Sequence, residues 1–239
     1  MDHGEKELRL KHLFAIATFL TAGTAVTYGA PACLPAQTLS SLIALGAGGC
    51  EIADKIYSNF SYSPGAGDPT SAQVNVGVDN ATAIFQTGLQ FGSSGLVWSS
   101  AFTVGYTVAV DPTACVAIYG AGKTCSVNAA QLAFQGALAS SSNTAALTAA
   151  FSGASPGSVS VNDLTTGANV NQIFFSPNFT ATSVVITGSV NTLAFPIDSF
   201  GLDIYQQVAS TAPEPATMFL IGGSLLGLGM FGRKKIARK

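Results

Sequence analysis

Few side chains in the middle of this chain could do chemistry, and most of them are aspartates. Asp198 and Asp203 stand five residues apart, and a glycosidase needs two carboxylates that converge on one bond. Spacing alone does not make carboxylates converge, so we expect this pair to face solvent. Both histidines, His3 and His12, lie near the N-terminus, which excludes a Ser-His-Asp or Cys-His arrangement from residues 37–211. We therefore predict no catalytic residue and a protein that is not an enzyme.

Other side chains could bind ligands. Asp68, Asp79 and Asp111 offer oxygen ligands for Ca²⁺, but no D-x-D-x-D loop groups them. Trp98 and Tyr106 could stack on sugar rings at a sheet face, although aromatic residues in strands more often belong to the core. The sequence therefore predicts no metal site and no cofactor, and glycan binding is kept as an alternative.

The four cysteines are an even number and favour disulfides in an exported domain. Three pairings of Cys33, Cys50, Cys115 and Cys125 are possible. We favour Cys33 with Cys50, joining a first helix to the next strand, and Cys115 with Cys125, closing a hairpin. A metal site is the rival interpretation, but no C-x-x-C motif occurs.

The last 27 residues consist of three parts. Pro213, Glu214 and Pro215 lead into the uncharged apolar run 216–232, whose 17 residues make about 25 Å of helix, slightly less than a bilayer's hydrocarbon core. We therefore expect a short, marginal transmembrane helix. Five cations follow and should hold that end in the cytoplasm: Arg233, Lys234, Lys235, Arg238 and Lys239.

This tripartite tail resembles the PEP-CTERM sorting signal of Gram-negative bacteria, and the resemblance covers Pro213 to Lys239. It implies that a membrane-embedded exosortase recognises the Pro-Glu-Pro, cuts nearby and releases or transfers the protein outward. A plain membrane anchor with an incidental Pro-Glu-Pro is the alternative. The resemblance thus predicts an exosortase partner, an inner-membrane precursor and a final place at the cell surface or outside the cell.

The first 32 residues have the order of a signal peptide. Basic residues between Lys6 and Lys11 precede an apolar stretch, 13–26, that is too short for a membrane anchor. Small residues offer cleavage sites at 23–25 and at 30–32, and the choice between them stays open. A lipoprotein would need Leu where Ala30 stands, so lipidation is not expected.

Between these signals we expect one domain. The 175 residues from Gln37 to Thr211 suffice for one core, and they carry eight acidic residues against two lysines and no arginine. This negative charge offers no footprint for nucleic acid. The expected organisation is a signal peptide at 1–32, a β-rich extracytoplasmic domain at 33–212 and the sorting signal at 213–239.

Alternating apolar and polar residues predict strands, most clearly at 102–110 and 74–78. The same pattern occurs at Ile56, Phe60 and Tyr62, at Val159 and Val161, at Val184 and Ile186, at Leu193 and Phe195, and at Leu202 and Ile204. Turns are expected at 63–65, 111–112, 120–122, 155–157 and 176–178.

Two segments depart from this strand pattern. Thr38 could cap a short helix that buries Leu39, Leu42 and Ile43, while the alanine-rich stretch 129–151 could be strand, helix or both. The expected fold is mainly β: an antiparallel, jelly-roll-like sandwich, with a closed barrel as the alternative.

Export, surface sorting and polar strands favour a structural or adhesive component of the extracellular matrix or biofilm. A glycan-binding module, with exopolysaccharide as its partner, is the first alternative, and a secreted hydrolase is the second.

Overall fold

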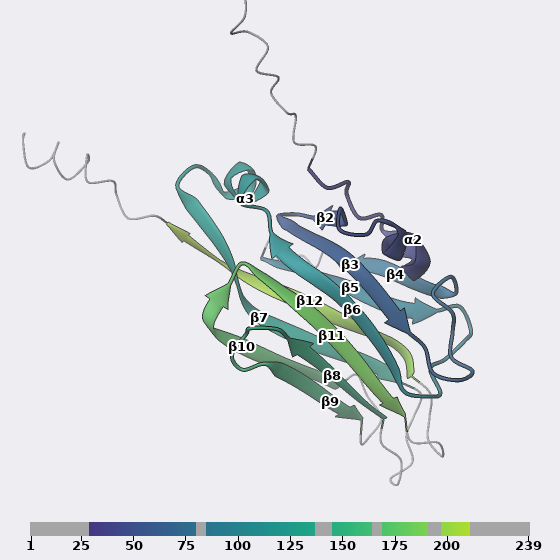
Figure 1. Ribbon diagram of the computed structural model, residues 1–239. Coiled ribbons are helices and arrows are strands. Elements are labelled where there is room, and N and C mark those ends of the chain that lie inside the picture. Colours follow the sequence, from purple (N-terminus) through teal and green to yellow (C-terminus); the bar gives the residue numbers. More distant parts are fainter. Residues whose placement is uncertain (1–28, 80–84, 137–144, 164–168, 191–196, 211–239) are drawn as a thin grey trace, which may run out of the picture.

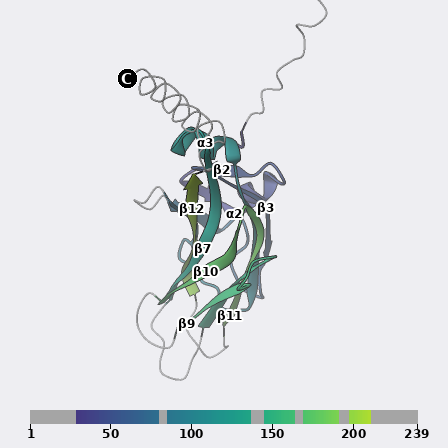
Figure 2. The ribbon, with the colours of Figure 1, turned by 90° about the vertical axis from the view of Figure 1, so that its left-hand side faces the viewer.

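The computed structural model describes residues 29–79, 85–136, 145–163, 169–190 and 197–210. Two six-stranded antiparallel sheets stack face to face in these ranges. Figure 2 shows the two layers edge-on, with helix α3 at one end. The predicted antiparallel sandwich is confirmed, and the two sheets replace the barrel alternative. Within the same ranges, no helix has the length and apolar character needed to cross a membrane; the expected span at 216–232 lies outside them.

The first sheet has the strand order β2-β3-β6-β11-β8-β9 and faces the viewer in Figure 1. Its strands are β2 (Cys50–Ile52), β3 (Lys55–Ser63), β6 (Phe102–Val110), β8 (Ala145–Phe151), β9 (Ser158–Asp163) and β11 (Ala181–Val190). The second sheet has the order β1-β4-β5-β12-β7-β10. Its strands are β1 (Ala36–Thr38), β4 (Val74–Asp79), β5 (Gln86–Ser93), β7 (Lys123–Gly136), β10 (Asn169–Phe179) and β12 (Ile197–Ser210).

The core lies between the sheets and follows the alternation in the sequence. On β6, Phe102, Val104, Tyr106 and Val108 are buried, and the residues between them point outward or are small. The predicted inward positions on β4, β9, β11 and β12 are likewise buried or half-buried. Because each strand has one apolar face, stacking the sheets removes both apolar faces from water.

Strand β3 differs from its predicted pattern. Its pairing with β6 shifts between Ser58 and Ser61, and Asn59 has a φ of 55°. This bulge adds one residue, which reverses the alternation. Tyr57 is therefore buried on one side of the bulge and Phe60 on the other, while Ile56, predicted to share the face of Phe60, is half-buried.

Two short helices flank the sandwich, α2 (Leu39–Ala44) and α3 (Pro112–Tyr119). Thr38 caps α2 by accepting a hydrogen bond from Ser41 N at 3.3 Å, as predicted, and Leu39 and Leu42 are buried, whereas Ile43 is only half-buried. The hairpin expected before Cys125 was wrong, because residues 112–119 are helical. Asp111 caps α3, and Pro112 starts it, a combination that favours a helix over the predicted turn.

Two further predictions concern strands β7, β8 and β10. The predicted turn at 176–178 lies inside β10, where the pairing with β7 becomes irregular between Phe174 and Phe179. The ambiguous stretch 129–151 is strand at both ends, in β7 and β8, with residues 137–144 outside the described ranges. Leu193 and Phe195 also lie outside them.

Both favoured disulfides are present. Cys33 is bonded to Cys50 on β2, and Cys115 on α3 is bonded to Cys125 on β7. The first therefore ties the segment before α2 to a sheet edge, and the second attaches α3 to the end of the sandwich.

Candidate functional site

Two aspartates flank a glycine on the outer face of the second sheet. Asp79 on β4 is the cross-strand partner of Gly88 on β5, and Asp203 on β12 pairs with the same glycine from the other side. Neighbouring strands are about 4.8 Å apart, so the two aspartate Cα atoms are about 10 Å apart. No side chain stands between them, because the residue there is glycine.

Each aspartate accepts a hydrogen bond from a glutamine of β5. Gln90 Nε2 donates to Asp79 Oδ2 at 3.0 Å, and Gln86 Nε2 donates to Asp203 Oδ2 at 2.9 Å. Gln86 lies two residues before Gly88 and Gln90 two residues after it, so both side chains are on the same face of the sheet. The amides therefore fix the positions of both carboxylates.

Backbone forms the floor of this site. A Cβ atom at Gly88 would lie 2.0 Å from Asp203 Oδ1, so only glycine lets Asp203 lean across β5. A shallow hollow of about 140 Å³ opens beside it. Its lining residues are Asp79, Gln90, Ala133, Ser199, Phe200, Gly201 and Asp203. The volume is below the roughly 300 Å³ at which pockets begin to enclose small ligands, so a ligand would lie on the face of the sheet.

The charge on Asp203 is disfavoured in this position. Burial raises the pKa of its carboxyl group, the hydrogen bond from Gln86 lowers it, and the nearby Asp79 raises it. The net shift is upward. Asp203 therefore gains from a partner that donates hydrogen bonds or carries positive charge.

Tyr205 and Gln131 extend the polar row. Tyr205 Oη donates to Gln131 Oε1 at 2.6 Å, and Gln131 is the cross-strand partner of Asp203 on β7. Carboxylates accept hydrogen bonds, whereas amides donate and accept them. Such a row can hydrogen-bond neighbouring hydroxyl groups of a polymer that lies across the strands.

Asp198 and Asp203 do not converge on one point. Asp198 and Asp203 share strand β12, where five residues span about 16 Å. Glycosidase carboxyl groups lie roughly 5–10 Å apart. Asp198 is exposed as expected, but Asp203 is half-buried, and its neighbour across the glycine is Asp79.

The other calcium candidates have structural roles. Asp68 Oδ1 accepts hydrogen bonds from Ser99 N and Ser100 N at 2.8 and 2.9 Å, and so holds two loops together. Asp111 caps α3. Of the three predicted oxygen donors, only Asp79 lies at the site described above.

The two aromatic candidates for sugar stacking are in the core, so that interpretation was wrong. Trp98 is 0% exposed and Tyr106 is 1% exposed. Trp98 packs against Phe102 and Phe200 at centroid distances of 5.2 Å, and its Nε1 donates to Tyr62 Oη at 2.8 Å. Neither ring can reach a ligand at the surface.

The link between Asp79 and Asp203 was not predicted from the sequence. It depends on β5 lying between β4 and β12, and β12 is more than a hundred residues further along the chain. The alternation of Gln86, Gly88 and Gln90 on one face was the available local signal. The predicted sorting residues Pro213, Glu214 and Pro215, and the five cations near the C-terminus, lie outside the described residues.

Comparison with known proteins identifies the C-terminal segment. Residues 211–235 match the family model of the PEP-CTERM protein-sorting motif. The chain therefore carries this motif, which indicates an exported protein that is processed by an exosortase. A search of curated protein sequences finds no match.

Three solved structures resemble the sandwich at low identity. TmCBM61 in complex with beta-1,4-galactotriose is 12% identical, with 64% of this chain and 89% of that chain covered and a TM-score of 0.30. CBM35 from Cellvibrio japonicus Abf62 is 13% identical, with coverages of 64% and 98% and a TM-score of 0.29. The enzymatically active domain of bacteriophage CBA120 tailspike protein 4 is 12% identical, with coverages of 64% and 19% and a TM-score of 0.28. These identities do not indicate a shared activity.

Proposed function

We propose that this is an exosortase substrate whose jelly-roll-like sandwich domain acts outside the cell in a structural or adhesive role, without catalysis. The match of the sorting motif to residues 211–235 supports the proposal that the protein is an exosortase substrate. In this proposal, the signal peptide at 1–32 starts export. The membrane helix at 216–232 then holds the precursor in the inner membrane until the exosortase cuts the precursor.

The composition of residues 37–211 supports a role without catalysis. This region has no histidine and no arginine, so two of the side chains most used for proton transfer and anion binding are missing. The disulfides Cys33–Cys50 and Cys115–Cys125 suit an oxidising compartment.

The processing can be read from the two ends of the mature protein. Protein purified from its native host should begin at residue 26 or residue 33 and should lack the basic cluster that starts at Arg233. Intact mass and terminal sequencing measure both ends. The control is protein expressed from the same gene in a host without exosortase, and this protein should retain Lys239. A mature protein that keeps Lys239 in its native host would contradict exosortase processing.

Glycan binding is the second candidate, and the arrangement around Gly88 favours it. Two aspartates whose Cα atoms are about 10 Å apart each have their carboxylate fixed by a glutamine amide, and backbone lies between them. Residues 37–211 carry a net negative charge. A neutral glycan whose hydroxyl groups donate hydrogen bonds therefore suits this face better than an acidic glycan.

A double variant tests this site. Asp79→Asn with Asp203→Asn should weaken retention of the full-length protein by the host's neutral exopolysaccharide about tenfold or more, because hydrogen bonds to charged groups are lost. Affinity electrophoresis measures the retention. Thr187→Val, on the outer face of the other sheet, should leave it unchanged.

The double variant should still fold. The pKa of Asp203 is raised in the folded protein, so the contribution of this group to stability is full below about pH 3.8 and is lost as the pH rises through the folded pKa. At neutral pH its charge therefore costs stability, and Asp203→Asn should make the domain equally or more stable. Unchanged retention would contradict glycan binding at this site, and release of reducing ends by the wild type would favour the hydrolase alternative.

A further inference from the structure

A lysine lies in the core of the sandwich, against the side-chain amide of a glutamine. Lys55 begins β3 in the first sheet and is 0% exposed, and Gln206 on β12 in the second sheet is 5% exposed. Lys55 Nζ contacts Gln206 Oε1. Their contact crosses the interior between the two sheets and joins residues 151 positions apart.

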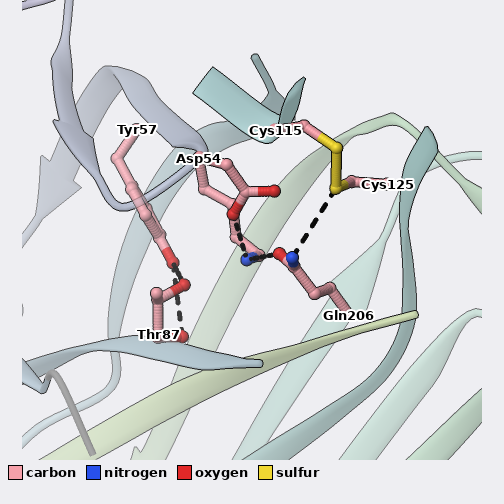
Figure 3. Close-up of polar contacts among 7 residues, drawn as sticks. Asp54, Tyr57, Thr87, Cys115, Cys125 and Gln206 are labelled. Carbon is pink, nitrogen blue, oxygen red and sulfur yellow. Dashed lines mark hydrogen bonds and ion pairs between the residues drawn. A yellow bond between two sulfur atoms is a disulfide. The ribbon is translucent and has the colours of Figure 1, made fainter. Parts of the chain in front are cut away.

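An acid and a disulfide complete the cluster. Asp54 is also 0% exposed, and its Oδ1 accepts a hydrogen bond from Lys55 Nζ at 3.0 Å. Gln206 Nε2 donates to Cys125 Sγ at 3.8 Å, which orients the amide. Figure 3 shows the Asp54 carboxylate and the Gln206 amide both facing the Cys115–Cys125 disulfide. A carboxylate oxygen of Asp54 and both sulfur atoms lie within 4.8 Å of one another.

The cluster does not suit a metal ion. Of the residues that the structure describes, Asp54, Cys115 and Cys125 form the one group of His, Cys, Asp and Glu side chains close enough to share an ion. The two sulfur atoms are joined to each other, and thiolates are the form that binds metal.

The charges of this cluster are poorly compensated. Asp54 Oδ2 is buried without a hydrogen-bond partner among the described residues. Burial lowers the pKa of the Lys55 ammonium group, and the charge of Asp54 and its hydrogen bond raise it in part. A buried ion pair gains stability only when every polar atom is satisfied. The lowered pKa of Lys55 makes its neutral amine easier to form, and a neutral lysine amine is a nucleophile.

We propose that Lys55 and Gln206 react to form an intramolecular isopeptide bond. Asp54 takes a proton from Nζ, and the freed lone pair attacks Cδ of Gln206. A bond forms between Nζ and Cδ, and the bond between Cδ and Nε2 breaks. The departing nitrogen receives one proton from the attacking nitrogen and leaves as ammonia, which then takes the proton held by Asp54 and departs as ammonium.

The reaction needs no oxidant and no energy source. An amine and a primary amide become a secondary amide and ammonia, and the positive charge leaves the core with the ammonium ion. The product links the two sheets covalently beside a disulfide that reducing agents can break. This inference rests on the cluster alone and does not depend on the proposed sorting or glycan binding.

A protease digest tests it on the wild-type protein. Full-length protein is denatured, reduced, alkylated and digested with trypsin. Trypsin should cut after Lys123 but not after Lys55, whose amine is blocked, and the two pieces produced at Lys123 should stay joined. Mass spectrometry should find the joined species lighter than the sum of its two parts by one ammonia. Lys123 is the internal control because it is half-buried at the surface, where its Nζ donates a hydrogen bond to Ser210 Oγ at the end of β12.

Two variants assign the roles. Lys55→Arg keeps the positive charge but should give no joined species, and Asp54→Asn keeps the size of the side chain but should reduce the joined fraction at least tenfold. Separate pieces from the wild type, or cleavage after Lys55 as complete as after Lys123, would overturn the isopeptide bond. An undiminished joined fraction in Asp54→Asn would overturn the role of Asp54. The wild type alone decides whether the bond exists, so that result does not depend on the stability of either variant.

Discussion

Changing Pro213, Glu214 and Pro215 together to alanine should leave unprocessed precursor in the inner membrane, with its basic C-terminus still attached. The reason is that the tripeptide is the recognition element in the proposed sorting, whereas the apolar run 216–232 supplies the anchoring energy and is unchanged. Alanine is a strong helix former, so the substitution should not weaken insertion. An epitope placed after Lys239 and followed by blotting in a host with exosortase measures the retained fraction.

The matched control alters the same tail but keeps its recognition element. Lys234→Arg with Lys235→Arg preserves the positive charge that orients the helix, so this variant should be processed like the wild type. Loss of the epitope from the triple alanine variant at the wild-type rate would refute the sorting proposal. The remaining interpretation would be a short membrane anchor with an incidental Pro-Glu-Pro.

Strand positions were predictable where burial and alternation coincide. Phe102, Val104, Tyr106 and Val108 repeat every second residue without interruption, and a strand with one buried face has the same period. The cap at Thr38 was predictable for a similar reason, because its partner is three residues away. Signals of this kind are complete within one short segment.

Backbone irregularities were less accessible to sequence reasoning. The bulge at Asn59 depends on the partner strand β6, and the same residues would alternate regularly without it. Residues 111–112 also had two interpretations, since Asp followed by Pro begins both turns and helices. What favoured the helix was the chain that follows, where Cys115 turns inward and pairs with Cys125.

Neither polar cluster could be assembled from the sequence. Asp79 and Asp203 meet across Gly88, and Lys55 meets Gln206, only because β12 lies at the centre of the second sheet. The order of strands in a sheet is not contained in the spacing of residues along the chain. The disulfides were predictable because the bonded cysteines are only 17 and 10 positions apart in the sequence, which makes both closures local.

Trp98→Ala should destabilise the sandwich domain by about 3–5 kcal/mol, a large part of the stability of an ordinary domain. Trp98 is fully buried between Phe102 and Phe200, and its Nε1 donates to Tyr62 Oη, which in turn donates to Pro69 O at 2.8 Å. The variant loses the ring contacts and leaves a cavity. Urea unfolding of the full-length protein, followed by tyrosine fluorescence and circular dichroism, should show a lower midpoint with a similar slope.

Tyr106→Phe is the matched control within the same core. The Tyr106 hydroxyl is buried and lacks a hydrogen-bond partner among the described residues, and burial raises its pKa well above the ordinary value. Removing it deletes an unsatisfied polar group and keeps the ring that contacts Phe60 and Phe91, so the domain should be equally or more stable. If Trp98→Ala instead leaves the unfolding midpoint unchanged and abolishes glycan retention, Trp98 binds ligand, and its assignment to the core is wrong.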